Sequence, residues 1–253
     1  MKIALIGHGK MGRAIEKIAR ERGHEIVSVI DADNLGDFDS PEFQSADVAI
    51  EFTTPATAVD NYRRAFAKGV KVVSGTTGWT ARMDEIKDEC LNHGATFFWT
   101  SNFSIGVNLF FAVNAYLARL MNHFPQYHPQ MKEIHHIHKL DHPSGTAISL
   151  ANGIISNVDS IARWTENPEH EPDEIEIAHE RLGEVPGTHI ITWDSPVDSI
   201  TIEHKAKSRD GFALGAVMAA EWVAGQKGFL TMDMLMDRII GDTRLTDILK
   251  SSK

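Results

Sequence analysis

Short apolar runs alternate with amphipathic segments along the first hundred residues. The run KIALIG (2–7) is nearly unbroken and ends at glycine, which predicts a strand buried on both faces. Residues 8–23 carry Met11, Ile15 and Ile18 at helical spacing and stop at Gly23, which predicts a helix. The same reasoning predicts strands at 24–33, 46–52, 70–75 and 95–102, with helices at 55–68 and 80–94. Strands that alternate with helices predict a parallel, right-handed, doubly wound sheet.

The pattern changes after residue 104. Residues 105–124 are an amphipathic stretch behind Ser104, whose hydroxyl is suited to cap a helix. Residues 127–136 are expected to be extended, and Pro143 to lie in the first turn of a helix through 144–152. Alternating apolar residues then predict half-buried strands at 174–183, 187–195 and 198–208, and a helix follows at 211–226. We therefore expect an α/β fold: a Rossmann-type doubly wound parallel sheet plus a second α+β domain with a mixed or antiparallel sheet.

A glycine motif joins the first predicted strand to the first predicted helix. Gly7-His8-Gly9-Lys10-Met11-Gly12 is a GxGxxG, and Asp31 closes the second strand 24 positions after Gly7. In such a loop the first glycine permits a tight turn, the second lets backbone approach a pyrophosphate, and the third lets helix pack close to strand. We therefore favour a dinucleotide site over a plain tight turn, with all six residues of the motif and Asp31 as cofactor-binding candidates.

Asp31 also bears on the choice of cofactor. A carboxylate at this position accepts hydrogen bonds from ribose hydroxyls and repels a 2′-phosphate, and Ala32 offers that phosphate no guanidinium. These features favour NADH, although Lys10 and Arg13 lie close enough in sequence to keep NADPH use open. Two loops leave the ends of predicted strands: Phe52-Thr53-Thr54-Pro55 and Gly75-Thr76-Thr77-Gly78. Their glycine and threonine residues suit close approach to the cofactor. Turn formation alone explains the sequence of either loop nearly as well. Their cofactor-binding candidates are Phe52, Thr53, Gly75, Thr76 and Thr77.

The segment EIHHIHKLDHPSGTA (133–147) concentrates titratable side chains before a predicted helix. A metal site is disfavoured, because adjacent imidazoles on a strand diverge and no cysteine or convergent carboxylate accompanies them. Histidines that are merely hydrogen-bonded at a strand end are a second alternative. We favour acid–base chemistry beside an anion, with backbone N–H groups of Ser144, Gly145 and Thr146 as the anion site.

Composition narrows the class of protein. The 253 residues carry a formal charge of −10 and no basic run, which argues against nucleic-acid binding. No apolar stretch approaches the roughly 18 residues of a membrane span, and glycines interrupt the N-terminal apolar run too early for a signal peptide, so we expect a cytoplasmic protein. The single cysteine, Cys90, is expected on a helix surface as an ordinary thiol.

The histidine segment carries a close family resemblance. The string His135-His136-x-x-Lys139-x-Asp141-x-Pro143-Ser144-Gly145-Thr146-Ala147 resembles the signature of the dihydrodipicolinate (4-hydroxy-tetrahydrodipicolinate) reductases of lysine and diaminopimelate synthesis. The resemblance extends in the family's order to GxGxMGR at 7–13, the two threonine loops, Ser101-Asn102-Phe103-Ser104 and SRDGFALGAV (208–217), and so spans essentially the whole chain.

This resemblance implies NADH- or NADPH-dependent reduction of a small dicarboxylate, (2S,4S)-4-hydroxy-2,3,4,5-tetrahydrodipicolinate, to tetrahydrodipicolinate. It implies that His135 is the acid–base catalyst, that Lys139 donates a proton, and that His136 and the Gly145-Thr146 pair bind substrate with Ser144 beside them. It adds Thr100, Ser101, Asn102 and Phe103 to the cofactor-binding candidates, and implies a homotetramer. We expect no metal, for the reasons given above. Residues 1–103 with 209–253 would form the dinucleotide-binding domain, and 104–208 the substrate-binding and oligomerisation domain.

Three positions depart from the family pattern: His142 stands where alanine is usual, Lys10 where arginine is common, and Ala32 where some members have a basic residue. The last two bear on cofactor preference rather than on the reaction. Arg209, at the crossover back to the first domain, is interpreted as a structural residue. Two other functions stay open, another small NAD-dependent imine reductase or dehydrogenase and a dinucleotide-sensing regulator, although neither explains the His-His-x-x-Lys string beside Ser-Gly-Thr.

Overall fold

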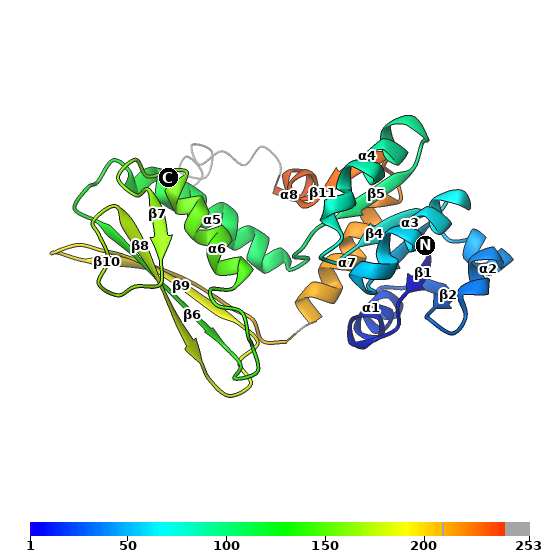
Figure 1. Ribbon diagram of the computed structural model, residues 1–253, viewed down its shortest axis with the longest axis horizontal. Helices are drawn as coiled ribbons and strands as arrows, with labels where there is room; N and C mark the ends of the chain where they lie inside the picture. Colours follow the sequence, from blue (N-terminus) through cyan, green and yellow to red (C-terminus); the bar gives the residue numbers. More distant parts are fainter. Residues whose placement is uncertain (209, 241–253) are drawn as a thin grey trace, which may run out of the picture. The chain divides into compact units, whose positions relative to one another are not determined.

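A computed structural model describes residues 1–208 and 210–240. The described chain divides into two compact units, which are described one at a time: residues 1–104 with 210–240, and residues 105–208. The elements of each unit are labelled in Figure 1. Arg209, whose structural role was predicted above, lies outside the described residues.

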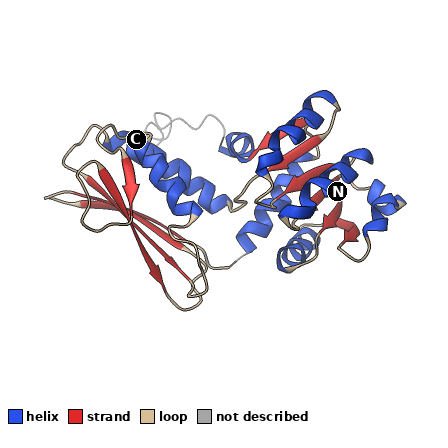
Figure 2. Cartoon of the chain, viewed as in Figure 1, coloured by secondary structure: helices blue, strands red, loops and turns tan. Residues whose placement is uncertain are grey.

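The first unit is built on a six-stranded sheet in which every pairing is parallel. Five helices of eight or more residues and a short one, α2, accompany it (Figure 2). Across the sheet the strands are β11 (Gly228–Thr231), β5 (Thr96–Trp99), β4 (Lys71–Ser74), β3 (Val48–Glu51), β1 (Lys2–Ile6) and β2 (Glu25–Ile30). The helices are α1 (Lys10–Glu21), α2 (Pro41–Gln44), α3 (Pro55–Ala67), α4 (Met83–Asn92), α7 (Asp210–Val223) and α8 (Met232–Ile240).

Helices cover both faces of this sheet, which explains why its strands are apolar along their length. On one face Ala4, Ala49 and Val72 pack with residues of α2, α3 and α4, among them Tyr62 and Ile86. On the other face α7 lies against β3, β4 and β5 and also contacts α1. Burial on both sides removes the polar alternation of a half-exposed strand. The predicted doubly wound parallel sheet is confirmed.

The order of the strands creates a switch point between β1 and β3. From β1 the chain passes to β2 on one side, and it then crosses to β3 on the other side of β1. The loops that follow β1 and β3 therefore diverge at the carboxyl edge of the sheet. Open α/β sheets bind their ligands in the crevice that such a divergence leaves.

The second unit contains a mixed five-stranded sheet and two helices, α5 (Ile105–Met121) and α6 (Gly145–Ile155). In the centre, β6 pairs antiparallel with β9 on one side and parallel with β8 on the other. Its strands, in order, are β10 (Ser199–Lys205), β9 (Thr188–Asp194), β6 (His128–His135), β8 (Glu174–Arg181) and β7 (Arg163–Thr165). The predicted second α+β domain with a mixed or antiparallel sheet is confirmed.

The core of this unit lies between one face of the sheet and the two helices. Met131, Ile177 and Trp193 point into it from three strands and pack against residues of α5 and α6. Inside the core, the Asn114 side chain of α5 donates a 2.9 Å hydrogen bond to the Leu150 carbonyl of α6. The alternation of buried and exposed residues along β6 and β9 follows from this one-sided covering.

Several local expectations are corrected by the structure. Cys90 is buried rather than on a helix surface, and burial raises the pKa of its thiol to about 11. The helix expected to begin at Pro143 begins at Gly145, with Ser144 as its N-cap.

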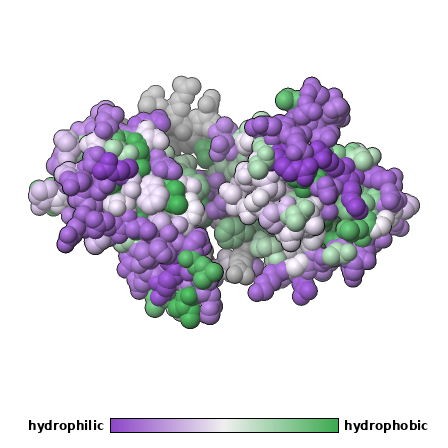
Figure 3. Space-filling model, viewed as in Figure 1, coloured by the Kyte–Doolittle hydropathy of each residue, from purple (hydrophilic) through white to green (hydrophobic). Residues whose placement is uncertain are grey.

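Within the part of the chain that the structure describes, no helix is both long and apolar enough to cross a membrane. In the view of Figure 3, hydrophilic residues cover most of the visible surface of each unit.

Candidate active site

A crevice of about 460 Å³ opens at the carboxyl ends of β1, β2 and β3 in the first unit. It is lined by six of the predicted cofactor-binding residues and by residues along α3. The predicted residues are Gly7, His8, Gly9, Asp31, Phe52 and Thr53, and those from α3 include Thr57, Asp60, Asn61 and Arg64. The crevice therefore lies at the switch point of the sheet, where a dinucleotide is expected.

The glycine loop has the close packing that its motif predicts. Gly7 has φ +89°, and a Cβ there would lie 2.2 Å from the Phe52 carbonyl oxygen. A Cβ on Gly12 would lie 2.2 Å from the Gly7 carbonyl oxygen, so neither position accommodates a side chain. The N-cap of α1 is Gly9, which has no side chain to cap the first turn. The helix N-terminus is thus available to an anion such as a pyrophosphate.

Asp31 is held beside this loop. Its Oδ2 accepts a hydrogen bond from the His8 backbone N–H at 3.3 Å, and its own N–H donates to the Asn34 side chain at 2.6 Å. The His8 imidazole points elsewhere, because its Nε2 lies 2.7 Å from Glu16 Oε2. Asp31 is exposed at the wall of the crevice, a position that fits a ribose hydroxyl. Arg64, which the sequence analysis did not identify, also lines this crevice, and its guanidinium lies over the Phe38 ring, 5.6 Å from the centroid.

A buried glutamate joins the two threonine loops. Glu51, at the end of β3, accepts hydrogen bonds from Thr53 N–H at 3.1 Å, Thr76 Oγ1 at 3.0 Å and Ser74 Oγ at 2.6 Å, and it also contacts Thr53 Oγ1. The side chain is fully buried, and burial raises its pKa although these donors oppose the shift. Thr76 is therefore a support for the loop at Thr53 and does not line the crevice.

The other cofactor-binding candidates lie around the crevice without lining it. Lys10 and Met11 open the first turn of α1, and Gly75 packs against the Phe52 ring, where a Cβ would lie 2.2 Å from a ring carbon. Thr77 and Ser101 are exposed, whereas Thr100 and Asn102 form a turn in which Asn102 N–H donates to Thr100 Oγ1 at 3.1 Å. Phe103 is buried against Phe52 and Phe98 and packs beneath the loops.

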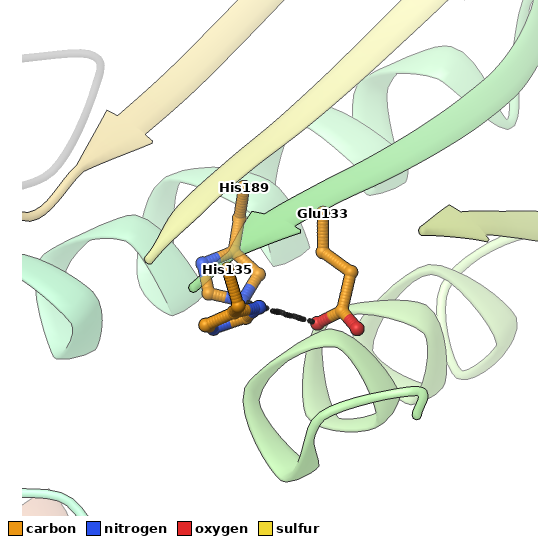
Figure 4. A group of neighbouring side chains, drawn as sticks. All are labelled: Glu133, His135 and His189. Atoms are coloured by element: carbon orange, nitrogen blue, oxygen red, sulfur yellow. Dashed lines mark ion pairs between the residues drawn. The ribbon is translucent and has the colours of Figure 1, made fainter. Parts of the chain in front are cut away.

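A second cluster occupies the end of β6 in the other unit and is drawn in Figure 4. Glu133 and His135 point to the same face of the strand, and Glu133 is the antiparallel partner of His189 on β9. His135 Nδ1 lies 3.4 Å and His189 Nε2 3.8 Å from Glu133 Oε2. The prediction that no carboxylate converges on the histidines is wrong, because Glu133 lies among them. The two-residue spacing of Glu133 and His135 indicates that their side chains share one strand face. Sequence alone did not reveal that His189 lies beside them.

Glu133 also fixes the N-terminus of α6. Its two carboxylate oxygens accept the Ser144 N–H at 3.1 and 3.2 Å, so this N–H is not free for an anion as predicted. Ser144 Oγ accepts from Ala147 N–H at 3.2 Å and lies 3.3 Å from His189 Nε2. Gly145 is exposed at the first helical position, and a Cβ there would meet nothing within 4 Å. A Cβ on Gly145 would therefore have open space around it, and the neighbouring Thr146 is half-buried.

Lys139 lies on the turn between β6 and α6. Its Nζ makes 2.8 Å contacts with both carboxylate oxygens of Asp141, and this pairing lowers the pKa of Asp141. Arg181, the parallel-strand partner of His135, donates to the Lys139 carbonyl at 3.3 Å and to the Asp141 carbonyl at 2.7 Å. Arg181 also lies 3.6 Å from Glu133 Oε1. One arginine thus anchors the turn to the strand that carries the cluster.

His136 and His138 lie on the same turn and not on a strand face as predicted, because β6 ends at His135. His136 is half-buried, whereas His138 is exposed and lies 3.3 Å from Glu184. Among the described residues, the Nδ1 atoms of His135, His136 and His189 are buried without a hydrogen-bond partner. Buried polar atoms are normally satisfied, so the Nδ1 atoms of His136 and His189 are candidates to bind a polar ligand, whereas His135 Nδ1 already lies 3.4 Å from Glu133.

The two buried imidazoles favour their neutral forms. Burial lowers the pKa of His135; Glu133 opposes this shift, while the positive charges of Lys139 and Arg181 add to it. Burial lowers the pKa of His189 further, to about 3, and the neighbouring His135, His204 and Lys139 act in the same direction. A neutral His135 beside a charged lysine provides a proton acceptor and a proton donor at one site.

The pKa of His189 predicts a pH dependence of stability. Between pH 6.5 and about 3 the unfolded chain binds a proton that folded His189 does not bind, so acidification favours unfolding. We expect the free energy of unfolding of the wild type, measured with urea, to fall by about 2 kcal/mol more between pH 7 and pH 5 than that of His189→Asn. The control His93→Asn, which changes an exposed histidine, should behave like the wild type. Equal falls for His189→Asn and the wild type would refute the assignment.

Comparisons with known proteins place the chain in one family. The family model described as dihydrodipicolinate reductase, N-terminus, matches residues 1–103, and the model of the C-terminus matches residues 106–236. The 4-hydroxy-tetrahydrodipicolinate reductase of Christiangramia forsetii is 44% identical over 94% of this chain and 98% of its own length. The reductase of the same name from Archaeoglobus fulgidus is 33% identical over 94% of this chain and all of its own length.

Solved structures agree on the fold. A dipicolinate-bound dihydrodipicolinate reductase from Paenisporosarcina sp. TG-14 superimposes with a TM-score of 0.70 at 24% identity, covering 91% of this chain and 97% of that one. A diaminopimelate (DAP) dehydrogenase of C. glutamicum gives a TM-score of 0.53 at 14% identity, covering 99% of this chain and 98% of that one. With both family models matched along nearly the whole described chain, the protein belongs to the dihydrodipicolinate reductase family.

Proposed function

We propose that this chain reduces (2S,4S)-4-hydroxy-2,3,4,5-tetrahydrodipicolinate to tetrahydrodipicolinate, using NADH in preference to NADPH, in diaminopimelate and lysine synthesis. The family membership makes it a nicotinamide-dependent oxidoreductase. The observation that carries the substrate assignment is the cluster at the end of β6, where an acid–base histidine, a lysine and a helix N-terminus meet. That combination suits an anionic ring that must exchange a proton.

The N-terminus of α6 is proposed to hold a substrate carboxylate. The helix has 11 residues, so its first-turn N–H groups carry a partial positive charge. Gly145 brings no side chain between the backbone and the ligand, and Thr146 stands next to it. The unpartnered Nδ1 of His136 offers a further hydrogen-bonding atom, which supports its proposed role in binding substrate.

Lys139 and His135 are proposed to divide the proton chemistry. Loss of the substrate's 4-hydroxyl as water would give a conjugated imine. The bound nicotinamide would then supply a hydride to this ring, and one proton would complete the reduction. The Lys139 ammonium is the proton donor in this proposal, because it is charged and lies on the turn that precedes α6. His135, whose neutral form is favoured by burial, accepts and returns a proton at the same site.

The cofactor is proposed to lie along the crevice of the first unit. The pyrophosphate would bind at the N-terminus of α1, and Gly9 allows backbone approach because a Cβ there would meet nothing within 4 Å. Asp31 would accept hydrogen bonds from the ribose and repel a 2′-phosphate. Arg64 and Lys10 are the cations that would moderate this repulsion, so NADPH is expected to be the poorer cofactor but still a substrate.

Two further expectations stay predictions, the first drawn from the family resemblance and the second from the sequence. One is assembly as a homotetramer, and the other is a cytoplasmic location. The face of the second sheet opposite the two helices carries Gln130 and Lys132 on β6 with Thr192 on β9, and a shallow hollow lies over them. This face is the proposed self-association surface.

The catalytic assignment predicts a loss of turnover in two variants. His135→Gln and Lys139→Ala should each lower kcat by about 10²-fold or more, because each removes a proton-transfer group. The decrease in NADH absorbance would be followed with aspartate semialdehyde, pyruvate and the preceding synthase supplied. Circular dichroism should report a folded chain in both cases, and His138→Gln is the matched control on the same turn. Near-wild-type turnover in both variants would overturn the roles, and NADH oxidation that does not depend on the synthase would overturn the substrate.

The role of Asp31 predicts a change of cofactor preference. The wild type should show a higher kcat/KM for NADH than for NADPH. Asp31→Ser should raise the NADPH to NADH ratio of kcat/KM by about tenfold, since removal of a repulsive charge is worth on the order of 1.4 kcal/mol. Asp33→Ser, which removes an exposed carboxylate two residues further on, is the matched control. A wild-type enzyme that prefers NADPH by more than tenfold would show that Asp31 does not act in this way.

A further inference from the structure

We propose that His142, Glu166 and His179 form a surface site for a divalent transition-metal ion such as Zn²⁺. The three side chains come together although they are separated in sequence. His142 Nδ1 lies 2.8 Å and His179 Nδ1 3.6 Å from the same oxygen, Glu166 Oε1. The two imidazole rings stack with their centroids 4.6 Å apart and their planes at 18°, so both rings present their Nδ1 atoms to one carboxylate.

The spacing of these atoms fits tetrahedral coordination. Zinc bonds of about 2.0–2.1 Å place neighbouring ligand atoms roughly 3.3 Å apart at the edges of a tetrahedron. The separations of 2.8 and 3.6 Å to Glu166 Oε1 bracket that value, and all three ligand atoms lie within 4.8 Å of one another. Two imidazoles and a carboxylate are a ligand set that zinc accepts, and exposure of the side chains leaves the fourth position to water.

Contacts of the neighbouring backbone hold the donors in place. Next to His142, the Asp141 carbonyl accepts a 2.7 Å hydrogen bond from Arg181. Glu166 follows β7 directly. The N–H of Asn167 donates a 3.1 Å hydrogen bond to Thr165 Oγ1, and this bond closes a turn around Glu166. His179 is a residue of β8. These contacts fix the backbone at the ligand positions, and a metal ion would require the exposed, stacked imidazole rings to rotate toward it.

The buried cluster of Glu133, His135 and His189 also has three potential ligands within 4.8 Å of one another, but its surroundings disfavour a cation. Glu133 already accepts the Ser144 N–H with both oxygens, and Arg181 lies 3.6 Å away. The Lys139 and Arg181 charges already lower the pKa of His135, and they would repel a metal ion for the same reason. The exposed cluster is thus the site to which we assign a metal.

A bound ion would connect the turn that carries Lys139 to strand β8. His142 lies three residues after Lys139, and His179 lies two residues before Arg181. Because the ion would bind the folded chain and not the unfolded chain, zinc should raise the melting temperature. The proposed metal site takes no part in the proposed reaction, so its test is independent of the substrate assignment.

The test is a zinc titration of the full chain without an affinity tag, stripped with chelator and followed by calorimetry. The wild type should bind one zinc ion with a Kd below about 10 µM that His142→Ala, Glu166→Gln and His179→Ala each weaken by about tenfold or more. The melting temperature should rise with zinc in the wild type and not in these variants. His138→Ala, which removes an exposed histidine from the same turn, should bind zinc like the wild type.

Two outcomes would overturn the proposal. One is a wild-type chain that shows no binding at about 100 µM zinc. The other is an affinity within twofold of the wild type in all three ligand variants. His135→Gln distinguishes the two clusters, because it removes a ligand of the buried cluster alone. If His135→Gln abolishes the zinc binding, the ion belongs to the buried cluster and the surface site is wrong.

Discussion

The second unit depends on one buried carboxylate. Glu133 is fully inaccessible to solvent, yet it contacts the Ser144 N–H of α6, His135 of its own strand, His189 of β9 and Arg181 of β8. A buried charge is tolerated only where partners compensate its lost hydration. The same compensation fixes the orientation of His135 and the position of the helix end. The histidine proposed for acid–base chemistry and the helix end proposed for anion binding are thus held together by a single side chain.

A buried glutamate has a comparable role in the first unit, at the proposed cofactor crevice. Glu51 ends β3 in a fully buried position and accepts hydrogen bonds from Thr53, Ser74 and Thr76. Two of these donors, Thr53 and Thr76, come from the loops that the sequence marks as cofactor-binding, and Ser74 ends β4. Thr76 supports Thr53 by accepting its backbone N–H, and the Phe103 ring packs against Phe52. In both units, a glutamate within or at the end of an inner strand organises the loops at the edge of its sheet.

Local patterns were sufficient to predict the glycine loop, Asp31 and the alternation of elements, because each of these depends on residues close in sequence. The partners of Glu133 could not be found in this way. His189 meets Glu133 through the antiparallel register of β6 and β9, and Arg181 meets His135 through the parallel register of β6 and β8. Strand alternation predicts which face a side chain occupies, but not which strand lies beside it. A charged residue inside an apolar run, as in VAIEF (48–52), was the one local signal for Glu51.

The central claim is that the charge of Glu133 positions His135 and the N-terminus of α6, and the pH dependence of kcat/KM for Glu133→Gln tests it most directly. The glutamine keeps the shape and one acceptor but removes the charge. We predict that kcat/KM falls by about tenfold or more, with NADH affinity unchanged, since hydrogen bonds to charged groups contribute about 1.5–3 kcal/mol. Glu133 raises the pKa of His135 against the effect of burial, so its loss should move the acid limb of the profile to lower pH. A folded variant with wild-type kcat/KM and an unshifted acid limb would contradict the account.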